Sequence, residues 1–165
     1  MPHGCFPDPL TWLHQTVRFA FFFALNVALL LRRSITTPSE AFFEIRILPV
    51  KGRCIFAKQE FARGSILERA PIILLPQEDW QIIEKTCLHN YAFGWGPDQD
   101  QAAIALGLGS LFNHSYEPNA FYRKLLDEQI VEFIALRDIR SGEEITVNYS
   151  GHPYGKIPMW FQEVL

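Results

Sequence analysis

Two segments, NHSYEPN at residues 113–119 and GEEITVNY at residues 142–149, decide the fold of this 165-residue chain. The first combines short polar side chains, which hydrogen-bond to nearby backbone, with a proline of fixed φ, so we expect a rigid turn. The second begins with the turn Ser141-Gly142 and continues with β-branched residues, which predicts a strand that ends on Tyr149. A rigid polar turn and a strand-terminal tyrosine suit a site that holds a small ligand with backbone groups and directs one phenol at it.

In this order, the two segments resemble the SET-domain family of protein-lysine methyltransferases. Gly52–Ala57 (GRCIFA) is similar to the family's N-terminal glycine motif, with Cys54 in place of the second glycine. Pro158–Gln162 (PMWFQ) is similar to the C-terminal segment whose aromatic residue covers the cofactor adenine. The resemblance covers residues 42–165. It implies a mostly-β (α+β) domain with a β-clip-like fold of small curved sheets, in which the C-terminal segment passes beneath a loop and forms a pseudoknot.

The composition fits one globular domain and shows no signature of a nucleic-acid-binding protein. The formal net charge is −3 and the pI is about 5.9, so direct nucleic-acid binding is not expected. Cys5, Cys54 and Cys87 are isolated, so neither a metal site nor a disulfide framework is predicted, which indicates a reducing compartment. The chain is therefore similar to a minimal SET protein that lacks the cysteine-rich zinc modules of many family members.

The N-terminal region is set apart by its composition. Residues 1–16 are predicted to be disordered, and residues 17–33 are apolar enough to predict a helix, although two polar residues interrupt it. An Arg pair follows the apolar stretch 17–31, which argues against a secretory signal. Three interpretations stay open: a membrane anchor that contacts the bilayer through 17–31 and leaves the catalytic domain on the cytoplasmic side, an extension from a misplaced start codon, or a packed helix. Residues 34–41 are predicted to be a linker, and the expected location is the cytoplasm, or the nucleus in a eukaryote.

Between residues 42 and 165, hydrophobic alternation and turn residues predict many short strands and few helices. The best helical pattern is Gln77–Thr86, which begins with acidic residues and spaces its apolar residues at helical intervals. The polar pair Asp127-Glu128 predicts the turn of a hairpin. The predicted strands are Phe43–Leu48, Arg53–Ala57, Ser65–Glu68, Pro71–Leu75, Tyr91–Trp95, Phe121–Leu126 and Gln129–Leu136.

The resemblance implies transfer of a methyl group from S-adenosyl-L-methionine to the ε-amine of a lysine in a protein or peptide. Such an in-line displacement depends on alignment and exclusion of solvent more than on a nucleophilic side chain. The sequence shows no convincing Ser-His-Asp or Cys-His arrangement. Tyr149 is the catalytic candidate, and by resemblance its hydroxyl lies near the transferring methyl group. The alternative is an edge-strand tyrosine with a solvated hydroxyl.

The remaining candidate residues also follow from the resemblance. Asn113 and His114 match the family's cofactor-binding pair, chiefly through the Asn amide and backbone groups. A lysine that enters a narrow aromatic channel loses hydration, which lowers its pKa below about 10.4. Trp160 is expected either to stack on the cofactor adenine or to form a lid on the core. The cofactor-binding candidates beside the Asn-His pair are Lys51, Gly52, Arg53, Cys54, Ile55 and Trp160, and the substrate-channel candidates are Tyr91, Tyr116 and Tyr122.

Two other classes of function stay open. One is a catalytically weak SET-like module that holds cofactor or peptide without turnover. The other is a membrane-anchored interaction protein in which the N-terminal apolar stretch is the functional part. The presence of both Asn113 and Tyr149 favours the enzyme, because decayed copies often lose such residues. No feature of the sequence specifies the substrate protein, the degree of methylation or the oligomeric state.

Overall fold

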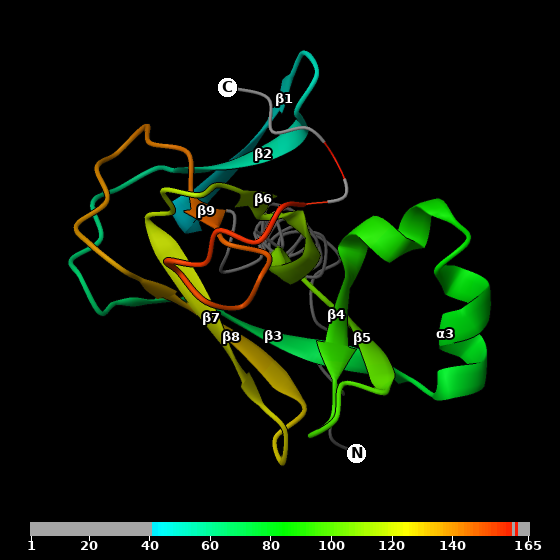
Figure 1. Ribbon diagram of the computed structural model, residues 1–165. Coiled ribbons are helices and arrows are strands. Elements are labelled where there is room, and N and C mark those ends of the chain that lie inside the picture. Colours follow the sequence, from blue (N-terminus) through cyan, green and yellow to red (C-terminus); the bar gives the residue numbers. More distant parts are fainter. Residues whose placement is uncertain (1–40, 160, 162–165) are drawn as a thin grey trace, which may run out of the picture. The chain divides into compact units, whose positions relative to one another are not determined.

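The computed structural model describes residues 41–159 and 161 (Figure 1). The predictions of a disordered terminus, an apolar helix and a linker fall almost entirely on residues 1–40, so they lie outside the described part, as does Trp160. Within that part, no helix has the length and apolar character needed to cross a membrane. Strands predominate among the regular elements of the described residues, which confirms the mostly-β fold class.

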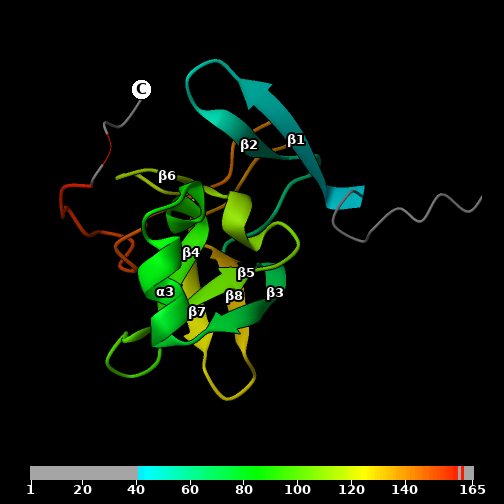
Figure 2. The ribbon, with the colours of Figure 1, turned by 90° about the vertical axis from the view of Figure 1, so that its right-hand side faces the viewer.

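The strands of the described part form three sheets. A five-stranded antiparallel sheet has the order β4-β5-β3-β8-β7, and β6 lies between it and the hairpin of β1 and β2 (Figures 1 and 2). The helical elements that lie wholly within residues 41–159 are one α-helix and two 3-10 helices. The elements are β1 (Phe43–Leu48), β2 (Gly52–Ala57), β3 (Ile66–Leu75), α3 (Gln77–Ile83), η1 (Cys87–Tyr91), β4 (Ala92–Trp95), β5 (Gln101–Ala105), η2 (Gly109–Leu111), β6 (Asn113–His114), β7 (Ala120–Leu125), β8 (Ile130–Ala135) and β9 (Thr146–Val147).

The long strand β3 joins the two halves of the five-stranded sheet. The sequence predicts two strands interrupted near Pro71, whereas the structure has one continuous strand. The part of β3 up to Pro71 pairs with β8, and the part from Ile72 onward pairs with β5. Pro71 therefore lies where the strand changes partner, and the carbonyl of Pro71 accepts a hydrogen bond from the N–H of Leu106 at 2.8 Å. Because the ladder changes there, a residue without an N–H is tolerated.

The strand β5 is absent from the sequence-based prediction. Its alanines Ala102 and Ala103 are completely buried between β3 and β4. Close packing continues at Gly109, where an added Cβ would lie 2.7 Å from the Cβ atoms of Ala105 and Ala70. Small residues therefore let η2 approach the sheet closely, and only glycine fits at position 109.

The predicted helix Gln77–Thr86 is α-helical only to Ile83. The side chain of Thr86 then accepts a hydrogen bond from the N–H of Leu88 at 3.2 Å and caps the 3-10 helix η1. The ring of Trp80 on α3 stacks on the ring of His89 on η1, with centroids 5.4 Å apart. This pair of short helices covers one side of the site that is described below.

The two faces of β7 and β8 differ sharply in chemistry. Glu132, which is 2% exposed, faces away from the aromatic core together with Arg69 and Arg123. Its carboxylate lies 3.3 Å from Nε of Arg69 and 2.5 Å from Nη2 of Arg123, the residues opposite it on β3 and β7. The other face carries Phe133, which is fully buried against the rings of Phe93 and Phe112. One face of these strands therefore carries an ion-pair network, and the other packs against the aromatic core.

Candidate active site

The two segments that decide the fold meet in the structure. β6 and β9 pair in parallel, with Asn113 opposite Thr146 and His114 opposite Val147. The N–H of Ser115 donates to the carbonyl of Val147 at 3.0 Å and extends the pairing. The polar turn therefore lies against the strand from the second segment, which is the contact that the predicted pseudoknot requires.

Asn119 ties the polar turn to the second segment. The side chain is 2% exposed, and its Nδ2 donates to Oε1 of Glu143 at 2.9 Å and to the carbonyl of Glu144 at 2.8 Å. Its Oδ1 accepts from the N–H of Thr146 at 2.9 Å. One amide therefore satisfies buried backbone groups on both sides of Ile145, a fully buried core residue. We call this set of three hydrogen bonds the Asn119 clasp.

Tyr149 is held at both ends by the turn that it faces. Its hydroxyl donates to the carbonyl of Phe112 at 2.9 Å, across 37 residues of sequence. Its backbone N–H donates to Nδ1 of His114 at 3.1 Å. Because Nδ1 accepts this bond, the neutral imidazole of His114 carries its proton on Nε2. The phenol of Tyr149 is thus fixed beside Phe112, the residue before Asn113.

The Tyr149 hydroxyl remains protonated at neutral pH. Burial raises the pKa of Tyr149 to about 12. Nearby groups that carry a negative charge when ionised contribute to this increase in the pKa. A phenol with this pKa acts as a hydrogen-bond donor and acceptor, because the phenolate needed for a general base is scarce. The nearby groups are Tyr91, Tyr122 and Glu144.

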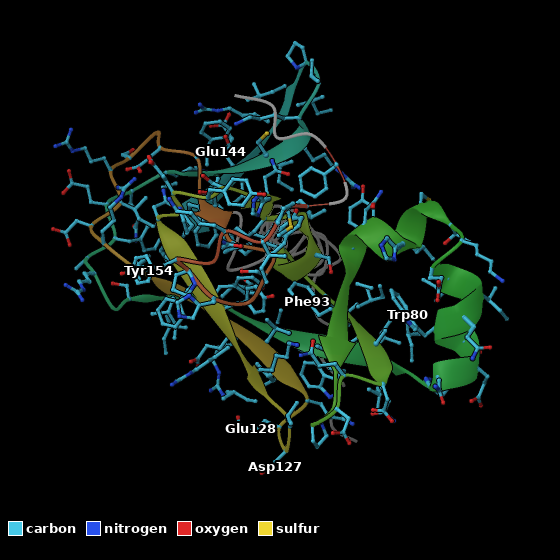
Figure 3. All side chains as sticks on the ribbon, in the orientation of Figure 1. Trp80, Phe93, Asp127, Glu128, Glu144 and Tyr154 are labelled. Carbon is cyan, nitrogen blue, oxygen red and sulfur yellow. The ribbon has the colours of Figure 1, made fainter. Side chains whose placement is uncertain are left out.

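Asn113 is oriented by a network that sequence reasoning did not anticipate. Its Nδ2 lies 3.1 Å from the carbonyl of Arg53, from Sγ of Cys54 and from Oε1 of Glu144. Glu144, which Figure 3 shows next to β2, also binds Nζ of Lys51 through Oε2 at 3.2 Å. These acceptors fix the amide so that Nδ2 faces them, and the Oδ1 acceptor is presented on the other side. Glu144 belongs to the GEEI pattern, but only the tertiary contact reveals what it touches.

The unusual Cys54 is part of this network. Its side chain is completely buried, and burial raises the pKa of the thiol, so it stays a neutral acceptor for the Asn113 amide. Gly52, in the same motif, has φ of +75°, a left-handed conformation that favours glycine. The side chain of Cys54 therefore faces the protein interior. The left-handed backbone conformation that favours glycine occurs at Gly52 and not at Cys54.

A pocket of about 700 Å³ opens beside Tyr149. Tyr122 and Phe93 line it, and their rings form an edge-to-face pair with centroids 5.1 Å apart. The hydroxyl of Tyr122 donates to the carbonyl of Tyr149 at 3.3 Å, and burial raises the pKa of Tyr122 to about 12. Figure 3 shows Phe93 on the β4 side of this region and Trp80 on the side of α3. The volume lies within the range of small-molecule sites, about 300–1,000 Å³.

Comparison with known proteins identifies the family. The SET-domain profile matches residues 52–150, which contain β6, β9 and Tyr149. The chain belongs to the SET-domain family of protein-lysine methyltransferases. It is 31% identical over 121 residues to a Schizosaccharomyces pombe protein named histone-lysine N-methyltransferase, H3 lysine-37 specific. That alignment spans 73% of this chain and 77% of the relative.

Two solved structures share the SET fold of this chain. A candidate histone methyltransferase of Plasmodium falciparum superimposes with a TM-score of 0.51 at 22% identity, over 66% of this chain and 92% of that one. CpSET8 from Cryptosporidium superimposes with a TM-score of 0.54 at 26% identity, over 65% of this chain and 56% of that one. The SET fold predicted from the sequence is thereby confirmed.

The three tyrosines predicted to line the substrate channel of the SET domain separate into two groups. Tyr91 and Tyr122 both line the pocket, whereas Tyr116 is not among its lining residues. The hydroxyl of Tyr116 donates to the carbonyl of Ile157 at 3.1 Å and accepts from the N–H of Met159 at 3.2 Å. In this structure Tyr116 therefore fastens the C-terminal segment to the SET domain.

An aromatic residue of the C-terminal segment does reach the site. The ring centroid of Phe161 lies 5.8 Å from that of His114 and 5.9 Å from that of Tyr149. The resemblance predicts an adenine contact for its neighbour Trp160, which lies outside the described residues. The pattern PMWFQ offers two adjacent aromatics, and the sequence contains no signal that selects between them.

The other cofactor-binding candidates differ in what they contact. Nη2 of Arg53 donates to the Tyr91 hydroxyl at 3.3 Å, and its guanidinium lies 5.7 Å from the centre of that ring. Ile55 is completely buried in the core, and its carbonyl accepts from the N–H of Ile145 at 2.8 Å. Ile55 therefore positions the second segment, while Arg53 remains at the edge of the site.

Acid is expected to weaken the SET domain through Glu143. Partial burial acts to raise the pKa of Glu143, but hydrogen bonds from Arg137, Asn119 and the backbone of Arg140 outweigh it and lower the pKa to about 2. This carboxylate therefore stabilises the fold fully above its ordinary pKa of 4.5, and the contribution is lost as the pH falls towards 2. In Glu143→Gln, circular dichroism should show a Tm that falls less steeply with acid. An unchanged acid slope, equal to that of the exposed control Glu60→Gln, would contradict the assignment.

Proposed function

We propose that this chain transfers a methyl group from S-adenosyl-L-methionine to the ε-amine of a protein lysine, with Tyr149 as the catalytic residue. The observation that carries the proposal is the position of the Tyr149 hydroxyl. It is protonated and bound to the carbonyl of Phe112, and it borders both the Asn113 network and an aromatic pocket. A site of this kind supplies alignment and desolvation, which are what methyl transfer requires.

The residues around Asn113 fit the chemical groups of S-adenosyl-L-methionine. Lys51 and Arg53 supply cations for a carboxylate, and the Asn113 amide oxygen supplies an acceptor for an ammonium. The rings of His114 and Phe161, with centroids 5.8 Å apart, supply an aromatic surface for the adenine ring of the cofactor. When bound, the cofactor supplies a methyl group on a positively charged sulfur, which becomes a neutral thioether.

The chain's own residues would act by positioning. The Tyr149 oxygen keeps its proton in the bond to Phe112, and a phenolic oxygen can also accept a hydrogen bond, here from the substrate amine. The aromatic wall of Phe93 and Tyr122 excludes water and favours the neutral amine, whose lone pair attacks. No protein base is assigned, because both tyrosine hydroxyls have a pKa of about 12.

Histone H3 is the first substrate to test, because the Schizosaccharomyces pombe relative is named for lysine-37 of that protein. Full-length protein would be incubated with methyl-labelled S-adenosyl-L-methionine and either histone H3 or H3 with that lysine replaced by arginine. Label on the first and not on the second supports both the reaction and the residue. Label on both supports the reaction with a different lysine.

A cell lysate provides the wider screen for other protein substrates. If neither H3 nor any lysate protein is labelled while calorimetry detects cofactor binding, the chain is a binding module and the transferase proposal fails.

Replacing Asn113 with alanine is expected to raise the Kd for S-adenosyl-L-methionine about tenfold, measured by isothermal titration calorimetry. The change removes the oriented acceptor and leaves Glu144 and Lys51 paired. Thermal unfolding of the same variant controls for loss of fold. An unchanged Kd in a well-folded variant would remove Asn113 from the cofactor site.

A further inference from the structure

The pocket beside Tyr149 contains a lysine that the proposed chemistry does not use. Lys124 lies on β7, two residues after Tyr122, so the two side chains share one face of the strand. The residues opposite them on β8 are Val131 and Phe133, which are both fully buried. Lys124 is therefore placed on the aromatic, pocket-lining face of the sheet.

The one carboxylate within the paired strands of this hairpin lies on the opposite face. Glu132 is sandwiched there between Arg69 and Arg123. Arg123 also borders the pocket, but its guanidinium is bound to Glu132, with Nε at 2.7 Å from Oε2. Strand alternation thus places Glu132 and its two arginines on the face opposite Lys124. In the turn of the hairpin, Glu128 pairs with Arg69, and neither Asp127 nor Glu128 forms an ion pair with Lys124.

Lys124 carries an uncompensated cation within the described part of the chain. No ion pair or hydrogen bond joins its ammonium to residues 41–159 or 161, and none of the described residues that line the pocket is Asp or Glu. Partial burial of the side chain lowers the pKa of Lys124, in keeping with an ammonium that has lost water and has no anionic partner. An anionic group of a ligand would stabilise a half-buried, unpaired ammonium more strongly than one that is exposed or already paired.

We propose that Lys124 binds a carboxylate of the substrate, from an Asp or Glu close in sequence to the target lysine. The assignment of the ligand as a residue flanking a target lysine rests on the proposed function. Two residues along a strand span about 6.6 Å, so the points at which the Lys124 and Tyr122 side chains leave the strand are offset by roughly that distance along the pocket. An extended substrate covers this offset in about two residues, which places the acid within about three positions of the lysine.

The test uses short fluorescent peptides with one central lysine and otherwise neutral residues. At each position near the lysine, a Glu peptide is compared with its Gln counterpart by fluorescence anisotropy with the full-length protein. The native protein should bind Glu about tenfold more tightly than Gln at one or two adjacent positions. Lys124→Met keeps the apolar stem and should reduce this ratio to about one, whereas Lys124→Glu should reverse it in favour of an Arg peptide.

Lys85→Met is the matched control, because Lys85 is exposed and lies outside the pocket lining. Equal affinity for Glu and Gln peptides at every position, or a Glu preference that survives in Lys124→Met, overturns the proposal. Methyl transfer to the same peptides is measured separately. A Glu preference in binding without any transfer would reject the proposed reaction and keep the carboxylate site, so the two failures are distinguishable.

Discussion

Replacing Tyr149 with phenylalanine is expected to reduce kcat for methyl transfer by at least about a hundredfold, which is the typical effect of removing one oriented hydrogen-bonding group from a reacting centre. The substitution deletes the hydroxyl that is bound to the carbonyl of Phe112 and keeps the ring beside His114 and Phe161. Affinity for S-adenosyl-L-methionine should stay nearly unchanged, because the Asn113 network is not touched. Labelled-methyl kinetics and calorimetry on the same preparation measure the two quantities.

Tyr154→Phe is the matched control for Tyr149→Phe. The side chain of Tyr154 is 70% exposed and lies outside the pocket lining, so the same chemical deletion there should leave kcat as in the native protein. Loss of the buried Tyr149 hydroxyl also leaves the Phe112 carbonyl without this donor, which costs about 1 kcal/mol of stability. Native kcat in a folded Tyr149→Phe protein would show that the hydroxyl has no role in the reaction.

Replacing Asn119 with alanine is expected to lower the stability of the domain by about 3 kcal/mol and the Tm by about 10 °C. The substitution breaks the Asn119 clasp and leaves the N–H of Thr146 and the carbonyl of Glu144 without partners in a buried region. Because the clasp ties the polar turn to the start of β9, which pairs with β6, activity should fall together with stability. Thermal and urea unfolding, followed by circular dichroism, give both numbers.

Asn119→Asp separates the two sides of the clasp. It keeps an acceptor for the Thr146 N–H, but it removes both donors and places a carboxylate beside Glu143. It should therefore be destabilising at neutral pH and partly recover in mild acid, when one of the two carboxylates becomes protonated. A Tm within a degree or two of native for Asn119→Ala would contradict the role of the clasp.

The local patterns in the sequence predict the strands that are rich in branched and aromatic residues. β1 occupies the predicted Phe43–Leu48, and the hairpin of β7 and β8 ends within a residue or so of the predicted limits. The strand β5 was not predicted, because QAAIA at residues 101–105 lacks the alternation and the branched side chains that favour a strand. Its conformation is set by β3 and β4 on either side, and this non-local pairing leaves no mark in a short window of sequence.

Some residues of the candidate site could be predicted from the sequence, and others could not. The order of the motifs brought Asn113, His114 and Tyr149 into one prediction, and the structure places them together. Their roles in binding and catalysis stay predictions. Glu144 and the carbonyl of Phe112 could not be found from the sequence, because a carboxylate in a polar turn and a backbone oxygen gain their meaning only from the atoms that they touch.

The exposed turn at Asp127-Glu128 separates the two halves of the site along the chain, since Asn113 precedes it and Tyr149 follows it (Figure 3). A cut at this turn would yield two polypeptides, each with half of the reaction centre and neither able to work alone. They would reassemble through the ladders of β8 with β3 and β7 and through the pairing of β6 with β9. If the two halves were fused to two interacting proteins, methyl transfer would occur only where those proteins bind each other. The methylated lysines would then report the interaction.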